Sequence, residues 1–210
     1  MRGEGFLAIW SDVERQDLTD YRHWLTREHT AERIATAGFL AVRVFQATRT
    51  DINRFFTLYE LEAPEVLDSP AYLARLNAPT PWTQRIMPRL GNFIRGGGVM
   101  KAGAGQGMGA VICALRLENL PQDASHLAGE LAGLDGIAAV RIGATDLART
   151  SVKTVEKGMR RNDVVFAGLL LIEALDQASL RNAIRKLAEI APGTSDSLVE
   201  PEIYQGVFAL

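Results

Sequence analysis

Residues 38–44 read Gly38-Phe39-Leu40-Ala41-Val42-Arg43-Val44, and residues 136–142 repeat the pattern as Gly136-Ile137-Ala138-Ala139-Val140-Arg141-Ile142. The Gly, Ala, Val and Arg match at equal offsets, and the other positions are apolar in both runs. Each run follows a helix-like stretch and precedes a second strand-like run, Leu58-Tyr59-Glu60-Leu61 in one half and Leu171-Ile172-Glu173-Ala174 in the other. Because an internal repeat constrains the whole fold, the sequence predicts one α+β unit written twice.

Each half is expected to follow the order β-α-β-β-α-β. The elements predicted for the first half are strand 6–10, a helix from Asp17 or Thr19 to Gly38, strands 39–48 and 54–61, a short helix after Ser69-Pro70 and strand 92–100. Those predicted for the second half are strand 110–117, helix 122–131, strands 137–145 and 164–173, helix 178–191 and strand 203–208. Residues 147–162 are extra, polar and basic, and are expected to form an exposed lid, a short helix or a mobile loop.

The fold class follows from how such a unit covers its sheet. Its helices lie on one face only, so the other apolar face needs a cover, and two tandem copies can supply it for each other. The sequence therefore predicts an α+β fold of two tandem ferredoxin-like domains, packed sheet to sheet as a pseudo-dimeric α+β barrel with a cavity or core between the sheets. The predicted domains are 1–101 and 110–210, joined by a glycine-rich linker, 102–109. Three glycines, 96–98, suggest a bulge or a close approach by another backbone or a ligand.

Composition narrows the classes of partner. The chain has 210 residues, of which 47% are apolar and 23% charged, and its net charge is −2, so we expect neither nucleic acid nor a membrane as partner. A single cysteine, Cys113, rules out an internal disulfide. The start of the chain lacks the apolar core of a signal peptide, and the longest apolar run, 164–172, is too short to span a bilayer, so we expect a cytoplasmic protein. The linker departs from the dinucleotide fingerprint at Met108, so no nucleotide site is expected there.

One part of the chain resembles a known superfamily. The phrases that carry the resemblance are Tyr21-Arg22-His23-Trp24-Leu25, Glu28-His29, Glu32-Arg33, Gly38-Phe39, Ser69-Pro70-Ala71-Tyr72-Leu73, Asn77 and Pro79-Thr80-Pro81-Trp82-Thr83. They are similar to the EthD-like branch of the dimeric α+β barrel superfamily, over about residues 5–100. The resemblance implies a fold that serves monooxygenases without metal, lactone isomerases, polyketide cyclases, haem-handling enzymes and proteins of unknown role. The second half lacks the helix aromatics and the histidine, so any site is expected in the first half.

His29 is the leading candidate for a catalytic group. It lies on one helix face with Tyr21 and Leu25, and Glu28 or Glu32 could fix its tautomer. Such a histidine could act as general base on an acidic C–H or a phenol. The alternative is a buried histidine satisfied by a backbone carbonyl or a carboxylate.

Arg43 is the candidate anion clamp, with Arg141 at the equivalent position of the repeat. Both lie opposite the valines and isoleucine that flank them. Alternatively, both face solvent or pair with Glu60 and Glu173 across their hairpins. The arginines of the first helix, Arg22, Arg27 and Arg33, are expected in solvent.

The aromatic residues are the candidate ligand-binding set, and all three tryptophans lie in the first half. They could line a pocket for an aromatic ligand or serve as ordinary core. The ligand-binding candidates are Trp10, Tyr21, Trp24, Tyr59 and Trp82. No metal site and no cofactor are predicted, because the three histidines lie far apart in sequence, and haem on His29 is a distant third possibility.

The sequence therefore predicts a small-molecule enzyme or binder for an aromatic or polyketide-like compound, with His29 as base. The alternative is a non-enzymatic ligand-binding or accessory barrel with a filled core. A homodimer is possible in addition, because exposed edge strands can pair.

Overall fold

The computed structural model describes residues 1–160, 164, 166–192 and 201–210, which fall into two compact units. Unit 1 comprises Met1–Val99, Asp146–Val165 and Val207–Leu210, and unit 2 comprises Met100–Thr145 and Phe166–Gly206. The extra segment between strands of the second half thus belongs to unit 1, whereas a division at the linker assigns it to the second domain. Residues 161 and 162 of that predicted insertion lie outside the described residues.

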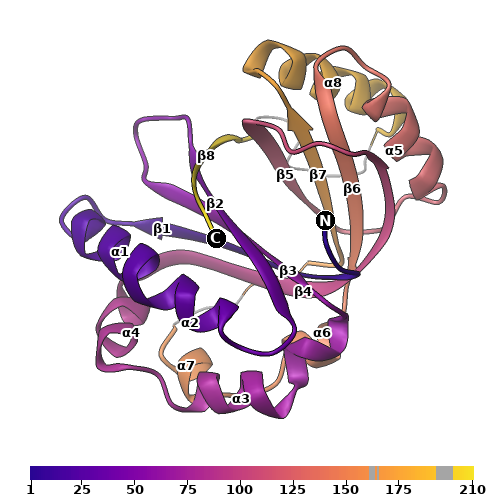
Figure 1. Ribbon diagram of the computed structural model, residues 1–210. Coiled ribbons are helices and arrows are strands. Elements are labelled where there is room, and N and C mark those ends of the chain that lie inside the picture. Colours follow the sequence, from indigo (N-terminus) through magenta and orange to yellow (C-terminus); the bar gives the residue numbers. More distant parts are fainter. Residues whose placement is uncertain (161–163, 165, 193–200) are drawn as a thin grey trace. The chain divides into compact units, whose positions relative to one another are not determined.

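Unit 1 follows the predicted order β-α-β-β-α-β (Figure 1). Its antiparallel sheet has the strand order β4-β1-β3-β2. The strands are β1 (Gly5–Val13), β2 (Phe39–Ala47), β3 (Arg54–Leu61) and β4 (Leu90–Gly105), whose last residues lie in unit 2. The helices are α1 (Leu18–Trp24), η1 (Leu25–His29), α2 (Thr30–Ile34), η2 (Pro64–Asp68), α3 (Pro70–Asn77), α4 (Pro81–Ile86), η3 (Met87–Arg89), α6 (Leu147–Thr150) and α7 (Val155–Gly158).

Two Ser/Thr-Pro signals start helices in unit 1. The hydroxyl oxygens of Ser69 and Thr80 accept the backbone N–H of the residue three positions on, and a proline follows each cap. These are favourable N-cap and first-turn residues. The helix predicted after Ser69-Pro70 is confirmed, and Pro81 begins a further short helix, α4.

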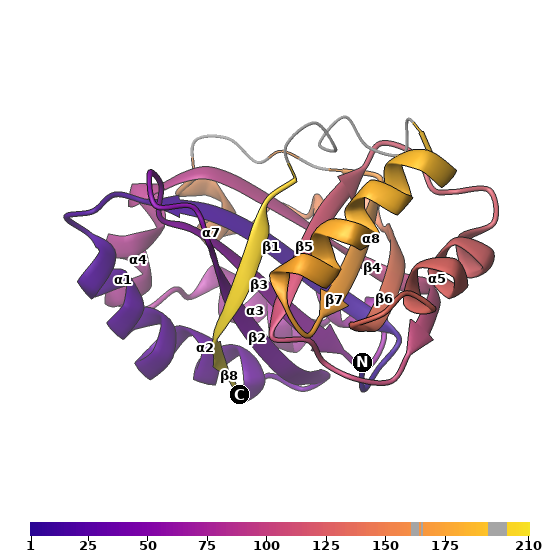
Figure 2. The ribbon, with the colours of Figure 1, turned by 90° about the horizontal axis from the view of Figure 1, so that it is seen from above.

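Unit 2 has the same order of elements and the strand order β8-β5-β7-β6. Its elements are β5 (Val111–Leu117), α5 (Ala124–Ala132), β6 (Ile137–Thr145), β7 (Gly168–Ala174), α8 (Gln177–Ile190) and β8 (Ile203–Ala209), whose residues from Val207 onward lie in unit 1. Helices α5 and α8 lie along these strands and share their apolar core (Figure 2). The linker prediction is wrong for residues 102–105, which continue β4 and lie beside β6, where Arg141 donates to the carbonyls of Ala104 and Gly105.

The repeated phrase forms the same local structure in both units. Gly38 and Gly136 have positive φ angles of 88° and 73°, which favour glycine after a helix. A β-bulge follows at matching positions, between Phe39 and Ala41 in β2 and between Ile137 and Ala139 in β6. The sequence repeat therefore reports a repeated hairpin geometry.

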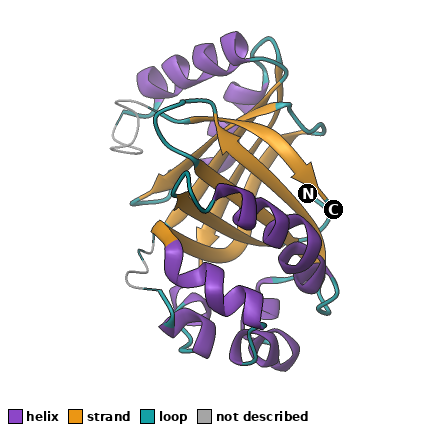
Figure 3. Ribbon diagram, turned by 90° about the vertical axis from the view of Figure 1, so that its left-hand side faces the viewer, coloured by secondary structure: helices purple, strands orange, loops and turns teal. Residues whose placement is uncertain are grey.

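One face of the sheet in unit 1 is covered by helices, and Figure 3 shows helices packed against strands. Residues alternate between faces, as expected for strands. The helix-covered face carries Leu7, Val42, Val44, Phe55 and Tyr59, which share a core with Tyr21 and Trp24 of α1. None of the described helices is long and apolar enough to cross a membrane.

Candidate functional site

A small cavity of about 30 Å³ lies between the helices and the helix-covered face of the sheet in unit 1. This is room for about two water molecules. Strand β1 supplies Ile9 and Ser11, the helix α1-η1-α2 supplies His29 and Arg33, and α3 supplies Tyr72. The inserted segment also reaches the cavity with Glu156 and Arg160.

His29 is presented by a π-turn within one continuous helix. Residues Leu25–His29 form this turn between α1 and α2, and the Thr30 hydroxyl donates to the Leu25 carbonyl at 2.7 Å. Single π-turns inside α-helices are frequent at functional sites. The imidazole stacks on the indole of Trp24 with ring centroids 4.1 Å apart, and the Trp24 indole N–H donates to the Thr83 hydroxyl at 3.0 Å. The Trp24 indole, fixed by its hydrogen bond to Thr83, therefore fixes the position of the His29 ring.

His29 and Tyr59 each have a buried polar atom without a hydrogen-bond partner among the described residues. His29 is 5% exposed and Tyr59 is 1% exposed. Within the described part of the chain, neither the His29 Nδ1 nor the Tyr59 hydroxyl has a hydrogen-bond partner. A buried polar atom left unpaired costs about 1–3 kcal/mol, so these atoms suit a water or ligand in the cavity.

Burial, and then the charges around the cavity, keep His29 neutral. Burial, followed by the charges of Arg33 and Arg160, lowers the pKa of His29 well below its ordinary value. Burial raises the pKa of Tyr59, so its phenol is also neutral. At neutral pH the cavity thus presents an imidazole that can accept a proton and a phenol that can donate a hydrogen bond.

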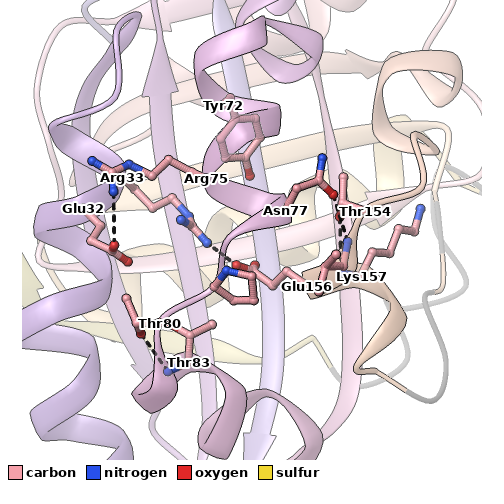
Figure 4. A network of polar contacts seen from close by, with 12 residues as sticks. Glu32, Arg33, Tyr72, Arg75, Asn77, Thr80, Thr83, Thr154, Glu156 and Lys157 are labelled. Carbon is pink, nitrogen blue, oxygen red and sulfur yellow. Dashed lines mark hydrogen bonds and ion pairs between the residues drawn. The ribbon is translucent and has the colours of Figure 1, made fainter.

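The described charged residues that line the cavity are three arginines and one carboxylate, Glu156. Arg33 is buried and donates to Glu156 at 2.5 Å, and Arg160 lies 3.9 Å from the same carboxylate (Figure 4 shows the Arg33 pair). Arg95 donates to the Thr150 carbonyl at 3.1 Å and to the Tyr72 hydroxyl at 3.3 Å. The lining charges sum to a cationic surplus, which favours an anion.

The inserted segment reaches the cavity because β4 lets it approach. The Thr150 hydroxyl accepts from the Gly97 N–H at 3.2 Å and donates to the Gly97 carbonyl at 3.1 Å. A Cβ at Gly97 would lie 2.8 Å from the Phe6 carbonyl oxygen and 2.8 Å from a Leu67 methyl group. The predicted close approach at the triple glycine is confirmed, and the approaching group belongs to this chain.

The structure brings together four of the seven predicted site residues. Those that line the cavity are Tyr21, Trp24, His29 and Tyr59. Trp82 lies outside the lining and donates to Asp20 at 2.9 Å. Neither carboxylate proposed to orient His29 is bonded to it, because Glu28 accepts from Thr80 and Glu32 pairs with Arg75.

Arg43 and Trp10 lie on the other face of the sheet from His29. Arg43 pairs with Glu60 at 3.9 Å across the hairpin, which is the alternative that the sequence left open, and its guanidinium lies 5.5 Å from the Phe45 ring centroid. Trp10 packs against Phe56 with ring centroids 4.7 Å apart. The structure therefore does not assemble Arg43 and His29 into one site.

The sequence missed the polar half of the cavity. Arg33 was expected in solvent and is 3% exposed, because Glu156 reaches it from a segment far along the chain. Arg95 was also missed as a lining residue. One signal was the spacing of Arg33, which follows His29 by four residues and so shares its helix face. The other was the insertion, for which a short helix was one of three expectations; its residues 147–150 and 155–158 are helical.

Metal and thiol chemistry find little support in the described residues. They contain no group of three His, Cys, Asp or Glu side chains placed to hold a metal ion. Cys113 is fully buried in unit 2, and burial followed by the charge of Glu202 raises the pKa of its thiol to about 12. It is thus a thiol rather than a thiolate at neutral pH.

No known protein family matches the sequence, and no curated protein matches it. Similar solved structures include an anthrone oxidase-like protein, with 10% identity, a TM-score of 0.61 and coverage of 100% of this chain and 93% of that one. A candidate monooxygenase from Fusobacterium nucleatum subsp. nucleatum has 12% identity, a TM-score of 0.56 and coverage of 100% and 95%. A candidate chlorite dismutase has 11% identity, a TM-score of 0.52 and coverage of 98% and 96%.

At these identities the likeness shows the fold alone. The chain shares a mixed α+β fold with these solved structures, as the sequence predicted at this coarser level. A function for this chain has to be argued from the residues that line the cavity in unit 1.

Proposed function

We propose that unit 1 binds a small aromatic or polyketide-like molecule and that His29 acts on it as general base. The observation that carries this proposal is the pair of buried, unpartnered polar atoms, His29 Nδ1 and the Tyr59 hydroxyl, in a cavity with surplus arginines. Neither atom has a structural partner among the described residues that would explain its position.

The chemistry suits removal of a proton from a phenol or from an acidic C–H. A neutral imidazole can accept the proton, and the resulting phenolate or enolate gains stability from nearby guanidinium groups. The Tyr59 hydroxyl can donate a hydrogen bond to the same developing anion. Aromatic walls, Trp24 and Phe93 among them, provide the apolar area that an aromatic substrate would contact.

A second candidate is a non-enzymatic barrel whose core is filled by its own side chains. The cavity volume of about 30 Å³ favours it, because an aromatic molecule does not fit without displacement of lining residues. A structural difference separates the two candidates: the enzyme requires the residues that line the cavity to move apart for a ligand, and the filled barrel does not.

The test uses anthrone. Its methylene group is acidic because it lies between two aromatic rings that are conjugated with a ketone. The anthrone oxidase-like neighbour suggests this probe. Exchange of the methylene protons in D₂O, followed by NMR without oxygen, measures proton removal alone. Wild-type protein should accelerate the exchange, and His29→Gln should remove most of the acceleration, by about 10²-fold or more.

The matched control is His23→Gln, which changes a histidine on the same helix outside the cavity. It should leave the exchange rate as in wild type. Equal rates in the His29 and His23 variants would reject His29 as the base, and the absence of anthrone binding by wild type would favour the filled core.

We also infer that the two units are tandem copies of a ferredoxin-like, EthD-like ancestor. The support is the shared order of elements, the positive φ at Gly38 and Gly136 and the matching bulges. A site in unit 1 alone agrees with the location of His29 and the tryptophans.

A further inference from the structure

We propose that Arg33 is a carboxylate-binding subsite of the cavity, that Glu156 occupies it as an internal ligand, and that the substrate is an aromatic carboxylic acid. This inference rests on the small-molecule function proposed above. It adds the class of substrate and explains how so small a cavity admits one.

The geometry at Arg33 is that of a bound carboxylate. Its guanidinium donates to the Glu156 carboxylate at 2.5 Å, and both side chains are about 95% buried. The guanidinium carbon lies 5.8 Å from the centroid of the Tyr72 ring, and the Tyr72 hydroxyl accepts a hydrogen bond from Arg95. Guanidinium groups bind planar carboxylates by paired, charge-assisted hydrogen bonds. A substrate carboxylate could therefore make the contacts that Glu156 makes.

Stability alone is a poor explanation for this pair. Two charges taken out of water lose hydration, and their attraction often only offsets that loss, so apolar residues of similar volume would stabilise the fold as well. Here the pair also adjoins a cationic surplus and two unpartnered polar atoms. These features fit a binding site better than a structural core.

The inserted segment is held at both of its helices, and Lys157 of α7 donates to the Thr150 carbonyl at 3.2 Å. Near α6, Thr150 bonds twice to Gly97 and the Asp146 N–H donates to the Gly97 carbonyl at 2.9 Å. Helix α7 has only four residues, and its first residue, Val155, is half exposed and donates its backbone N–H to the Asn77 side chain at 3.1 Å. Glu156 follows directly, so displacement of α7 would open the cavity while α6 stays attached to β4.

Displacement has a thermodynamic consequence. A ligand carboxylate must compete with a carboxylate that the chain holds beside Arg33 at all times, which lowers its apparent affinity. Removal of the Glu156 charge should therefore strengthen the binding of small carboxylates and leave neutral analogues unaffected.

The experiment measures the affinity of benzoate and of its neutral analogue benzamide for wild type, Glu156→Gln and Glu65→Gln. The Glu65 variant is the matched control, because Glu65 pairs with Arg149 of the same inserted segment at 3.0 Å outside the cavity. We expect benzoate to bind Glu156→Gln at least tenfold more tightly than wild type, the Glu65 variant to behave as wild type, and benzamide to gain nothing. Equal benzoate affinity in all three proteins, or an equal gain for benzamide, overturns the inference.

Hydrogen exchange of the wild-type protein tests the same inference if the Glu156→Gln variant does not fold. At a saturating concentration of benzoate, amide hydrogen exchange should become faster at residues 154–158, because Glu156 has left Arg33, and slower at residues 25–29 around His29. Unchanged or slower exchange at 154–158 overturns the inference.

A neutral phenol separates this inference from the proposed function. Naphthol should bind wild type and protect residues 25–29, and His29→Gln should weaken it. Naphthol binding without any advantage for benzoate in Glu156→Gln rejects the carboxylate subsite alone. Failure of both ligands to bind rejects the subsite and the small-molecule function together.

Discussion

The burial of a neutral His29 should make unit 1 less stable in acid by a calculable amount. The pKa of His29 is lowered well below 6.5 in the folded protein, mainly by burial and then by Arg33 and Arg160. In the unfolded chain a histidine has an ordinary pKa of about 6.5. The stability that this difference contributes is present above about pH 6.5 and is lost as pH falls from there towards the folded pKa.

The magnitude follows from the proton that only the unfolded chain binds. When the pH falls from about 7.5 to 5.5, protonation of an ordinary histidine lowers the free energy of the unfolded chain by about 1.4 kcal/mol. A buried histidine that stays neutral gives the folded state almost no such stabilisation. The other charged groups around the cavity contribute to wild type and variant alike. The charged and titratable lining residues are Tyr21, Arg33, Tyr59, Tyr72, Arg95, Glu156 and Arg160.

The assay is urea unfolding of wild type, His29→Gln and His23→Gln at both pH values. All three tryptophans, Trp10, Trp24 and Trp82, belong to unit 1, so tryptophan fluorescence follows this unit alone. Wild type and the His23 variant should lose about 1.4 kcal/mol more on acidification than His29→Gln. The same loss in all three proteins would mean that His29 takes up a proton in the folded state, and would refute the reasoning.

Three further substitutions test the packing of unit 1 by the same fluorescence-detected unfolding. Gly97→Ala places a Cβ against backbone and should destabilise unit 1 by about 1–3 kcal/mol; an unchanged midpoint would contradict the close approach. Thr83→Val removes the acceptor of the buried Trp24 indole N–H and should cost about 1–3 kcal/mol, with wild-type stability as the contrary result. Glu60→Gln removes the carboxylate that lies 3.9 Å from the buried Arg43 and should destabilise by about 1–3 kcal/mol, whereas an unchanged or stabilised variant would show that the ion pair is unimportant.

The hairpins could be predicted because their signals are local. Gly38 and Gly136 each follow a helical stretch, and the backbone there needs a positive φ that glycine accepts at little cost. Alternation then placed Arg43 opposite Val42 and Val44, as the structure has it. These inferences depend on neighbours within a few residues, which a single sequence displays.

The site could be predicted only in part, because its polar half depends on distant contacts. Helical periodicity placed His29 with Tyr21 and Leu25, and all three line the cavity. Arg33 continues this four-residue spacing, yet its charge led to the expectation that it lies in solvent, since nothing nearby in sequence could neutralise a buried guanidinium. Its partner Glu156 lies in an insertion whose position no local pattern specifies. The expectation of a cavity between the sheets also missed this one, which lies under the helices of unit 1.

The arginines around His29 oppose its protonation, yet they can still favour the proposed reaction. Proton transfer from a phenol to His29 creates an imidazolium and a phenolate together, so the net charge in the cavity does not change. The positive charge of the arginines raises the free energy of the imidazolium and lowers that of the phenolate. The effect is larger for whichever of the two lies closer to the arginines. Transfer is favoured when the substrate oxygen lies nearer to the guanidinium groups than the imidazole does. A substrate carboxylate bound to Arg33 would hold the aromatic ring beside the arginines, in the place where the Glu156 carboxylate now pairs with Arg33 and Arg160.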